Sequence, residues 1–371
     1  MTVAIESKKK ALLEQYDEKR RIYESFLAEI EHQVKGLLLT SHIPYNSITP
    51  RLKTRDSLAE KIERKQYKYN DLDEVTDIAG VRVITYYAND VDKVSKIIES
   101  EFDVDKENSI DKRTSIEPDR FGYCSVHYVV SISPARLALK ECHAYAGMKC
   151  EIQIRTVLQH AWAEIEHDIG YKSEITIPKE MRRSFSRIAG LLEIADKEFD
   201  NIRQDLGKYK DNATQSIGNE NFLDFDINAV VLDVLMQSNS DIQRINKHIQ
   251  DLTGTQLYSN IDSSYYESTI KRLHWLGIET VRQIYELIHD HTENAIAIAT
   301  KKLNNYKTQE DPGRISTLVA FFYLCYAFLL HGDCSKEKIY NYLVDTHIGR
   351  PGEQRHGADE LLQLKSVLSI N

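Results

Sequence analysis

Apolar side chains recur at helical spacing in two long segments, residues 6–39 and 178–210. In the first segment they return every seven positions, as Tyr16, Tyr23 and Ile30 do. In the second, steps of four and three alternate, which is the heptad pattern of helices that pack side by side. Both segments are therefore predicted to be amphipathic helices, packed on the rest of the chain or on a second subunit.

Four shorter segments are rich in Val, Ile and Tyr, residues that favour strands. These strand candidates are residues 80–87, 102–110, 124–132 and 147–154. Helical patterns accompany them at residues 55–67, 90–100 and 156–170. Strands and helices that alternate in this way predict an α/β or α+β domain in which helices pack on a sheet.

Polar stretches divide the chain further. SHIPYNSITP at 41–50 contains Pro and Ser and is predicted to be a break between elements. NATQSIGNENF at 212–222 is polar and contains Gly, which predicts a linker. Residues 223–371 have no strand-rich stretch and are predicted to be helical. We therefore expect two domains, residues 1–211 and residues 223–371.

The composition narrows the class of protein. A chain of 371 residues is long enough for two domains with cores of their own. Its formal net charge of −9 argues against a protein that coats nucleic acid. We expect no membrane span and no signal peptide, because the apolar runs are short or interrupted. The five cysteines form no CxxC pair, so we expect a reducing cytoplasm and no structural zinc site.

The run from Glu151 to Arg155 carries the most informative chemistry. Strand alternation places Glu151, Gln153 and Arg155 on one face and two isoleucines on the other. These side chains suit a site for a metal ion and polyphosphate, because such a site needs oxygen ligands together with fixed positive charge. Asp77 supplies a second carboxylate just before an apolar strand.

Several motifs, in this order, resemble the synthetase domain of the RelA/SpoT family. They are DIAGVRVI at 77–84, GYCSVHY at 122–128, and EIQIRT at 151–156 followed by HAWAEIEHDIGYK at 160–172. The resemblance implies an α+β fold, a nucleotidyltransferase-like mixed sheet flanked by helices. It also implies a pyrophosphokinase that uses ATP and GDP or GTP to make the alarmones ppGpp and pppGpp.

The resemblance assigns an ATP site to a basic cluster that begins before the first motif. The residues that would hold the phosphates of ATP are Arg51, Lys53, Ser57, Lys61 and Arg64, with Arg82 assisting. Arginine suits bidentate contact with phosphate, and lysine acts as a point charge. Asp77 would bind Mg²⁺, and Glu151 would either bind Mg²⁺ or act as the general base for the acceptor hydroxyl.

The resemblance places the acceptor nucleotide near the GYCSVHY motif. Tyr123 would stack on its guanine, since stacking on an aromatic side chain contributes about 1–3 kcal/mol. The other acceptor residues would be Arg120, Ser125, His127, Gln153, Arg155 and His160. The chain departs from the family at Cys124, where many members have Arg or Gln, and at Arg120, which stands in for a lysine. These departures concern the acceptor more than the fold.

Two other activities are not expected. Only about 40 residues precede the synthetase motifs, too few for the hydrolase module of the family. His160, Glu164 and His167 share one helix face, but their spacing differs from the HExxH arrangement of zinc enzymes.

Three functions remain open on the sequence. The first is a stand-alone (p)ppGpp synthetase. The second is a toxin-type member of the family that pyrophosphorylates an adenine nucleotide or the 3′ end of tRNA, although the net acidity argues mildly against tRNA. The third is a catalytically degraded protein that senses nucleotides or binds a partner. In the third case the helical second domain would be the working part. In the two enzyme cases it is expected to regulate the chain or to bind a protein partner or second subunit.

Overall fold

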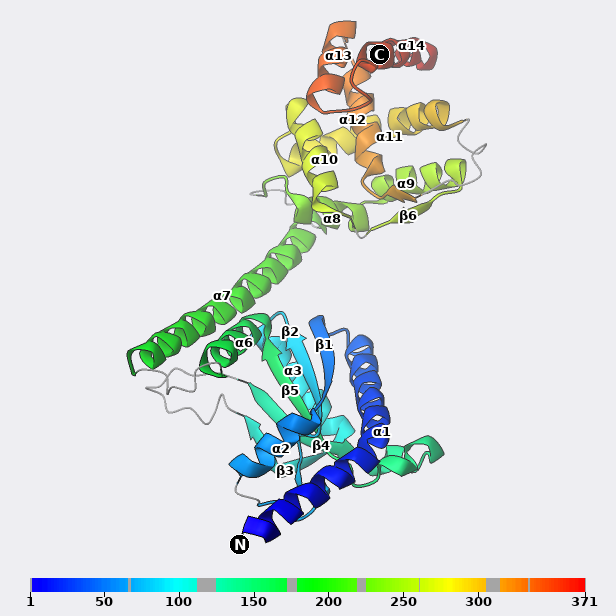
Figure 1. Ribbon diagram of the computed structural model, residues 1–371. Coiled ribbons are helices and arrows are strands. Elements are labelled where there is room, and N and C mark those ends of the chain that lie inside the picture. Colours follow the sequence, from blue (N-terminus) through cyan, green and yellow to red (C-terminus); the bar gives the residue numbers. More distant parts are fainter. Residues whose placement is uncertain are drawn as a thin grey trace. The chain divides into compact units, whose positions relative to one another are not determined.

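The computed structural model describes residues 2–65, 68–111, 125–171, 179–218, 225–259, 261–304, 314–332 and 334–370. The chain forms two compact units, Met1–Gln204 and Asp205–Asn371. Helix α7 (Lys179–Gly218) contributes residues to both units (Figure 1).

The N-terminal unit contains a five-stranded sheet in the order β1-β2-β5-β4-β3. The strands are β1 (Tyr45–Leu52), β2 (Ala79–Thr85), β3 (Phe102–Asp111), β4 (Val126–Ile132) and β5 (Cys150–Thr156). The central pair β2 and β5 is parallel, and the other three pairs are antiparallel. The mixed sheet and its helices confirm the predicted α+β fold.

Strand β1 is an element that the sequence analysis missed, because Pro50 falls within the predicted break at 41–50. A proline has no backbone N–H to give to a neighbour, so it is tolerated only where no neighbour needs that donor. Strand β1 is at the edge of the sheet, where it pairs with β2 alone, and Pro50 lies opposite Val81. The edge position therefore explains why a proline-containing segment is a strand.

Helices α1 (Thr2–Thr40), α2 (Arg55–Arg64) and α3 (Ala88–Glu101) contribute the helical residues of the core on the apolar face of this sheet. The other helices of this unit ahead of α7 are the short α5 (Pro134–Leu137) and α6 (Val157–Tyr171). Two 3₁₀ turns, Leu72–Glu74 and Lys140–Tyr145, lie between these helices. The seven-residue repeat of α1 brings Tyr16, Tyr23 and Ile30 into one core with the sheet. Each large apolar side chain buried in this way contributes roughly 1.5–3 kcal/mol.

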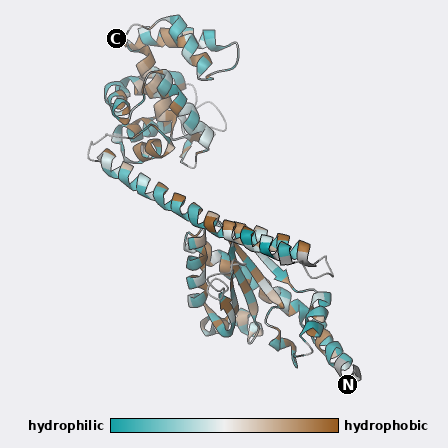
Figure 2. Cartoon of the chain, turned by 90° about the vertical axis from the view of Figure 1, so that its left-hand side faces the viewer, coloured by the Kyte–Doolittle hydropathy of each residue, from teal (hydrophilic) through white to brown (hydrophobic). Residues whose placement is uncertain are grey.

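The predicted linker at 212–222 is partly wrong, because α7 continues as a helix to Gly218. Ala213 and Ile217 lie on one side of its last turns and are buried in the core of the C-terminal unit. Burial against that core outweighs the low helix preference of the polar residues between them. Residues 219–222 of the predicted linker lie outside the described residues. Hydrophobic residues also recur along the first half of α7 (Figure 2).

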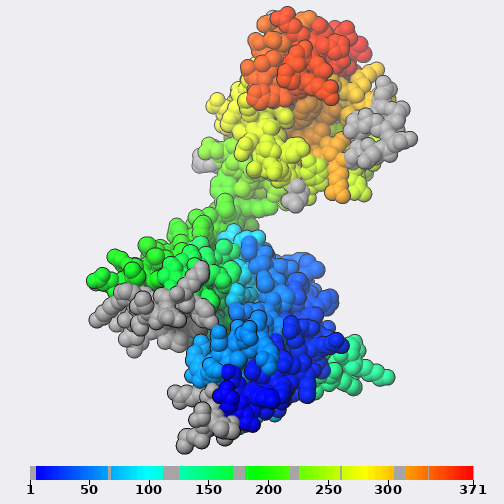
Figure 3. All heavy atoms as spheres, in the orientation of Figure 1, coloured from blue at the N-terminus to red at the C-terminus, as the bar shows by residue number. Residues whose placement is uncertain are grey.

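The C-terminal unit is built mainly of helices, as predicted. They are α8 (Ala229–Ser238), α9 (Ser240–Thr253), α10 (Ser263–Trp275), α11 (Val281–Leu303), α12 (Val319–Leu330), α13 (Lys336–Asp345) and α14 (Gln354–Leu368). Two three-residue strands that the sequence did not predict, β6 (Gln256–Tyr258) and β7 (Arg314–Ser316), pair in parallel. Helix α12 is the most apolar and is almost wholly buried. Helices α13 and α14 pack against each other and gather at one end of the unit (Figure 3).

None of the helices in the described parts of the chain is both long and apolar enough to cross a membrane.

Candidate active site

The face of the sheet opposite the helical core carries the polar residues of the site. Pairing sets Gly80 of β2 beside Glu151 of β5, and Arg82 beside Gln153. On the other side of β5, His127 of β4 is opposite Gln153. Alternate residues of a strand point to opposite faces, so these side chains share a face while Ile152 and Ile154 enter the core.

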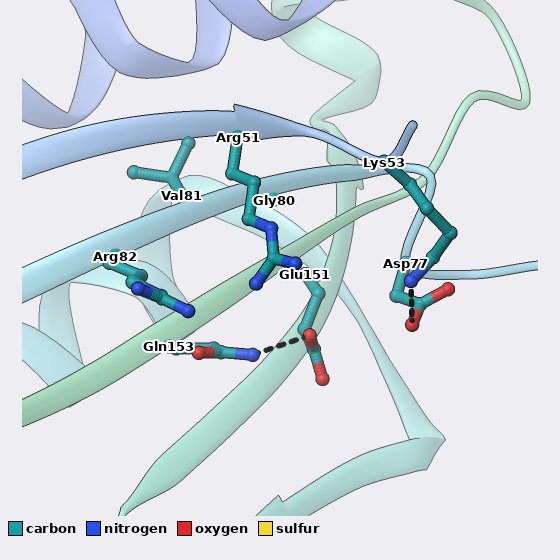
Figure 4. A pocket seen from close by; sticks show the side chains of 8 residues that line it. All are labelled: Arg51, Lys53, Asp77, Gly80, Val81, Arg82, Glu151 and Gln153. Atoms are coloured by element: carbon teal, nitrogen blue, oxygen red, sulfur yellow. Dashed lines mark hydrogen bonds and ion pairs between the residues drawn. The ribbon is translucent and has the colours of Figure 1, made fainter. Parts of the chain in front are cut away.

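A pocket that is open to solvent lies over this face. Its lining residues come from β1, β2, β5 and the segments beside them: Arg51, Lys53, Asp77, Gly80, Val81, Arg82, Glu151 and Gln153. In Figure 4 the Arg51 guanidinium and the side chains of Arg82, Glu151 and Gln153 converge, while Lys53 and Asp77 meet beside them. The pocket thus combines three basic side chains with two carboxylates.

Hydrogen bonds join the polar residues of β4 and β5 into one chain. Arg155 Nη2 donates to Gln153 Oε1 (2.5 Å), and Gln153 Nε2 donates to Glu151 Oε2 (2.7 Å). From the other side, His127 Nδ1 lies 3.0 Å from Glu151 Oε1, and His127 Nε2 lies 2.7 Å from the hydroxyl of Ser125. Both oxygens of Glu151 are therefore held by neighbours.

The surroundings of Glu151 keep this carboxyl group ionised. Burial alone would raise its pKa, because a charge is poorly solvated there. The hydrogen bond and charge of His127, the hydrogen bond from Gln153 and the charge of Lys61 outweigh burial and lower the pKa to about 2. Glu151 is therefore a fixed negative charge at neutral pH.

Asp77 forms the second acidic position, together with two lysines. Lys53 Nζ lies 3.2 Å from Asp77 Oδ2, and Lys61 Nζ lies 2.6 Å from Asp77 Oδ1. The backbone of Lys53 is itself fixed, since its N–H donates to Ile78 and its carbonyl accepts from the hydroxyl of Tyr16 on α1. Contacts with the core therefore fix the backbone of Lys53, one of the two lysines that pair with Asp77.

Helix α2 presents the remaining basic residues. Thr54 caps it by accepting from the backbone N–H of Ser57 (3.2 Å). Its last turn carries Lys61, which contacts Asp77. Ser57 is half-buried and Arg64 is exposed, and neither lines the pocket. The sequence-predicted ATP residues are therefore brought together except for these two.

Helix α6 forms a wall beside the same face. Its Glu164 accepts from Arg82 Nη1 (2.9 Å), and His160 Nδ1 lies 3.7 Å from the same carboxylate oxygen. Burial, with the nearby charges of Arg155 and Arg82, lowers the pKa of His160, so its imidazole is neutral at pH 7. A second hollow, lined by Arg51, Arg82, His127, Gln153, Arg155, Ala163, Glu164, Glu166 and His167, adjoins the first and shares three of its residues.

Two site residues were missed from the sequence. Glu164 was weighed only as part of a zinc trio, although its spacing of four from His160 already placed it on the same helix face. Gly80 lies beside both Arg51 and Glu151 in the sheet, where any side chain would project into the pocket. Two predicted acceptor residues, Arg120 and Tyr123, lie outside the described residues.

The donor set fits a magnesium ion. Asp77 and Glu151 line one pocket and supply carboxylate oxygens, which are the ligands that Mg²⁺ prefers. Each oxygen of Glu151 accepts one hydrogen bond and has a second lone pair. The two carboxylates are therefore the residues that would hold the ion.

Comparison with known proteins identifies this region. Residues 50–176 match a family described as the region found in RelA / SpoT proteins. The chain is 29% identical over 190 residues to GTP pyrophosphokinase YjbM of Bacillus subtilis, covering 50% of this chain and 86% of YjbM. It is 27% identical over 172 residues to GTP pyrophosphokinase YwaC of the same organism, covering 46% and 79%.

Two solved structures are also similar to part of the chain. Small alarmone synthetase 1 from Bacillus subtilis is 25% identical, with a TM-score of 0.45, over 53% of this chain and 99% of that one. A GTP pyrophosphokinase family protein from Streptococcus pneumoniae is 26% identical, with a TM-score of 0.45, over 53% and 96%. Over residues 50–176, this chain carries the region found in RelA/SpoT proteins.

Proposed function

We propose that the chain is a GTP pyrophosphokinase, which transfers the β,γ-pyrophosphate of ATP to the 3′-hydroxyl of GDP or GTP. The products are AMP and ppGpp or pppGpp. The observation that carries the proposal is the pocket in which Arg51 and Arg82 face the ionised Glu151 while Lys53 pairs with Asp77 beside them. This pocket lies within the RelA/SpoT region, and the curated relatives are named GTP pyrophosphokinases.

The basic side of the pocket is proposed to bind ATP. Arg51 and Arg82 suit bidentate contact with phosphate, and Lys53 and Lys61 add point charges. Ser57 and Arg64 complete the proposed set from α2. Asp77 and Glu151 are proposed to hold Mg²⁺, which when bound neutralises charge on the triphosphate.

The side formed by β4, β5 and α6 is proposed to bind the acceptor nucleotide. His127, Gln153, Arg155 and His160 offer donors and a positive charge there. Ser125 is hydrogen bonded to His127 behind them. Tyr123 and Arg120 are proposed to stack on the guanine and to meet its phosphates.

In the proposed reaction the acceptor oxygen attacks the β-phosphorus of ATP. A bond forms between that oxygen and phosphorus, the bond from the β-phosphorus to the oxygen bridging it to the α-phosphate breaks, AMP leaves, and the proton of the acceptor hydroxyl passes to the solvent water that reaches the open pocket. The residues contribute position and charge, because phosphoryl transfer asks for little covalent chemistry from the protein. Glu151 is better suited to hold a metal ion and to orient His127 than to take the proton, because a carboxylate of pKa about 2 is a weak base at pH 7.

The test is a transfer assay with Mg²⁺ and ATP labelled in its terminal phosphate. GDP, GTP, ATP and bulk tRNA are offered in separate reactions. Label on a guanine nucleotide supports the proposal. Label on tRNA or on an adenine nucleotide would keep the ATP chemistry and replace the acceptor, as in a toxin-type enzyme. Absence of transfer to all four would overturn the proposed activity.

We also propose that helical surfaces of the chain bind a partner, either a second copy or a regulatory protein. The support is α7, whose heptad residues Met181, Ile188, Phe199 and Leu206 are each about half exposed in the single chain. Light scattering of the purified chain tests the first occupant, since a monomeric mass would exclude a stable second copy.

A further inference from the structure

Helix α6 stands beside the site with little apolar burial to hold it there. Among its residues up to Ile169, only Trp162 is buried. Ile165 and Ile169 are 55% and 49% exposed. A helix that buries so little apolar surface depends on specific polar contacts for its position.

The first of these contacts is at the N-terminus of α6. Thr156 ends strand β5 and directly precedes α6. Its hydroxyl accepts from the backbone N–H of Gln159 (3.1 Å), and Gln159 Oε1 accepts from the backbone N–H of Thr156 (2.9 Å). This reciprocal pair is a capping box. One residue thus joins the strand that carries Glu151 to the helix that carries Glu164.

Helix α7 reaches this cap with a buried carboxylate. The hydroxyl of Thr156 donates to Asp196 Oδ2 over 2.7 Å, and Asp196 is 4% exposed. A negative charge at a helix N-terminus is stabilised by the partial positive charge of the unpaired amides there. Asp196 therefore binds α6 at its first turn, and Trp162 Nε1, donating to the carbonyl of Phe185, ties it to α7 again (3.3 Å).

One turn later, a second aspartate of α7 accepts a hydrogen bond from the first turn of another helix. Asp200 Oδ2 accepts from the backbone N–H of Asn89 (3.0 Å), in the first turn of α3. The N-cap of α3, Tyr87, offers no side-chain cap of its own. Strands β2 and β5 are parallel, so the helices that follow them both start at the C-terminal ends of these strands. Asp196 and Asp200, four residues apart on α7, each meet one of these two N-termini.

We propose that Asp196 is a positioning residue of the transfer reaction. It fixes, through Thr156, the angle at which α6 leaves β5, and so places His160 and Glu164 at the acceptor side of the pocket. The proposal rests on the proposed function for its kinetic consequence. Asp200 provides an internal comparison, because it holds α3, which does not line either hollow of the site.

The expected effect of Asp196→Ala is selective. Loss of the contact frees the first turn of α6, so the KM for GDP rises by about tenfold, because a small misplacement of binding groups is costly. The KM for ATP rises less, by about twofold to threefold: Arg82 contacts Glu164 of α6, but Arg51, Lys53 and Lys61 lie on β1, on α2 and between them, away from α6. Asp200→Ala, which removes an equally buried carboxylate from the same helix, leaves the ratio of the two KM values unchanged.

Hydrogen exchange of the full chain separates this proposal from the proposed function. Asp196→Ala should speed exchange at the amides of Gln159 and His160, and Asp200→Ala should speed exchange at Asn89. These readings do not depend on activity. If the wild-type chain transfers no pyrophosphate, the proposed function fails and the exchange rates alone decide whether Asp196 holds α6.

Thr156 supplies a second pair of variants, in case Asp196→Ala does not fold. Thr156→Ser keeps the hydroxyl and should keep the wild-type KM for GDP, whereas Thr156→Val removes the hydroxyl and should raise it as Asp196→Ala does. Equal rises in both KM values, or unchanged exchange in α6, would overturn the positioning role.

Discussion

His127 Nδ1 lies 3.0 Å from Glu151 Oε1, across two adjacent antiparallel strands of the sheet. Together with the hydrogen bond from Gln153, this contact fixes a carboxylate as an anion on the floor of the pocket. Glu151 therefore keeps its negative charge throughout the neutral pH range, and this charge faces the basic residues of the pocket.

Removing that charge is expected to remove the activity without unfolding the chain. In Glu151→Gln the side chain keeps its shape and an oxygen for the Gln153 amide, but it loses the charge that meets His127. We expect pyrophosphate transfer to fall by about 10²–10³-fold, because the proposed ion that stabilises charge in the transition state loses a ligand. Labelled transfer measures the loss, and circular dichroism checks the fold. Glu107→Gln, on the exposed part of edge strand β3, is the matched control and should behave as wild type.

The space above Gly80 provides a graded test of the pocket. A Cβ at this position would lie 3.6 Å from the carbonyl oxygens of Arg51 and Glu151, which is ordinary contact. Gly80→Ala should therefore fold and retain most nucleotide binding. Gly80→Val extends further into the pocket, and we expect a rise of at least tenfold in the KM for ATP, about 1.4 kcal/mol of binding. Equal KM values for the two variants would mean that ATP does not occupy this pocket.

Asp77 is expected to govern the metal requirement. Asp77→Asn leaves Lys53 and Lys61 without the carboxylate that both contact, and it removes one of the two proposed ligands of Mg²⁺. We expect the Mg²⁺ concentration for half-maximal transfer to rise by about tenfold or more, since a ligating charge is lost. Calorimetric titration of Mg²⁺ into the ATP complex gives a reading independent of turnover. An unchanged metal requirement would remove Asp77 from the ligand set.

The buried Asp196 predicts how stability depends on pH. Burial raises its pKa to about 6, with a smaller opposing effect from the Thr156 hydroxyl and a further rise from the charge of Asp200. The folded chain therefore holds this proton more tightly than the unfolded chain does, so the contribution is complete below pH 3.8 and is lost as pH rises through about 6. Its size is on the order of 3 kcal/mol.

Asp196→Asn tests this dependence, because it keeps an oxygen for Thr156 and cannot titrate. The free energy of unfolding of the variant, measured by denaturant titration between pH 4 and 7, should fall less steeply than that of wild type. The other charged groups of this region, Asp200, Asp90, Arg203 and Lys93, are present in both proteins. Parallel curves would show that Asp196 does not titrate in this range.

The sequence could predict the polar strand but not its partners. Alternation along β5 was enough to place Glu151, Gln153 and Arg155 on one face, because a strand has a fixed period of two. The register that brings Gly80 and His127 beside them depends on pairing between distant segments, and no local pattern reveals it. Glu164 was assigned no site role for the same reason, since its contact with Arg82 spans 82 positions of sequence.

Local composition was misleading where tertiary structure decided the outcome. Pro50 led to the prediction of a break where β1 lies, and the polar residues at 212–218 led to the prediction of a linker where α7 continues. Segment 45–52 can be a strand because it lies at the edge of the sheet. The helix α7 extends to Gly218 because its last turns pack on a core formed mainly by residues after 225. Both are properties of the assembled fold rather than of the segment.

Pro50 of β1 also makes the edge of this sheet less able to pair with an extended segment of another molecule. An open sheet edge presents free donors and acceptors on which another extended chain can add, the first step of aggregation. Pro50 removes one donor from the backbone of β1, at the edge that borders the basic pocket. The strand that carries Arg51 of the proposed ATP site therefore also makes it harder for the sheet of one molecule to continue into the sheet of the next.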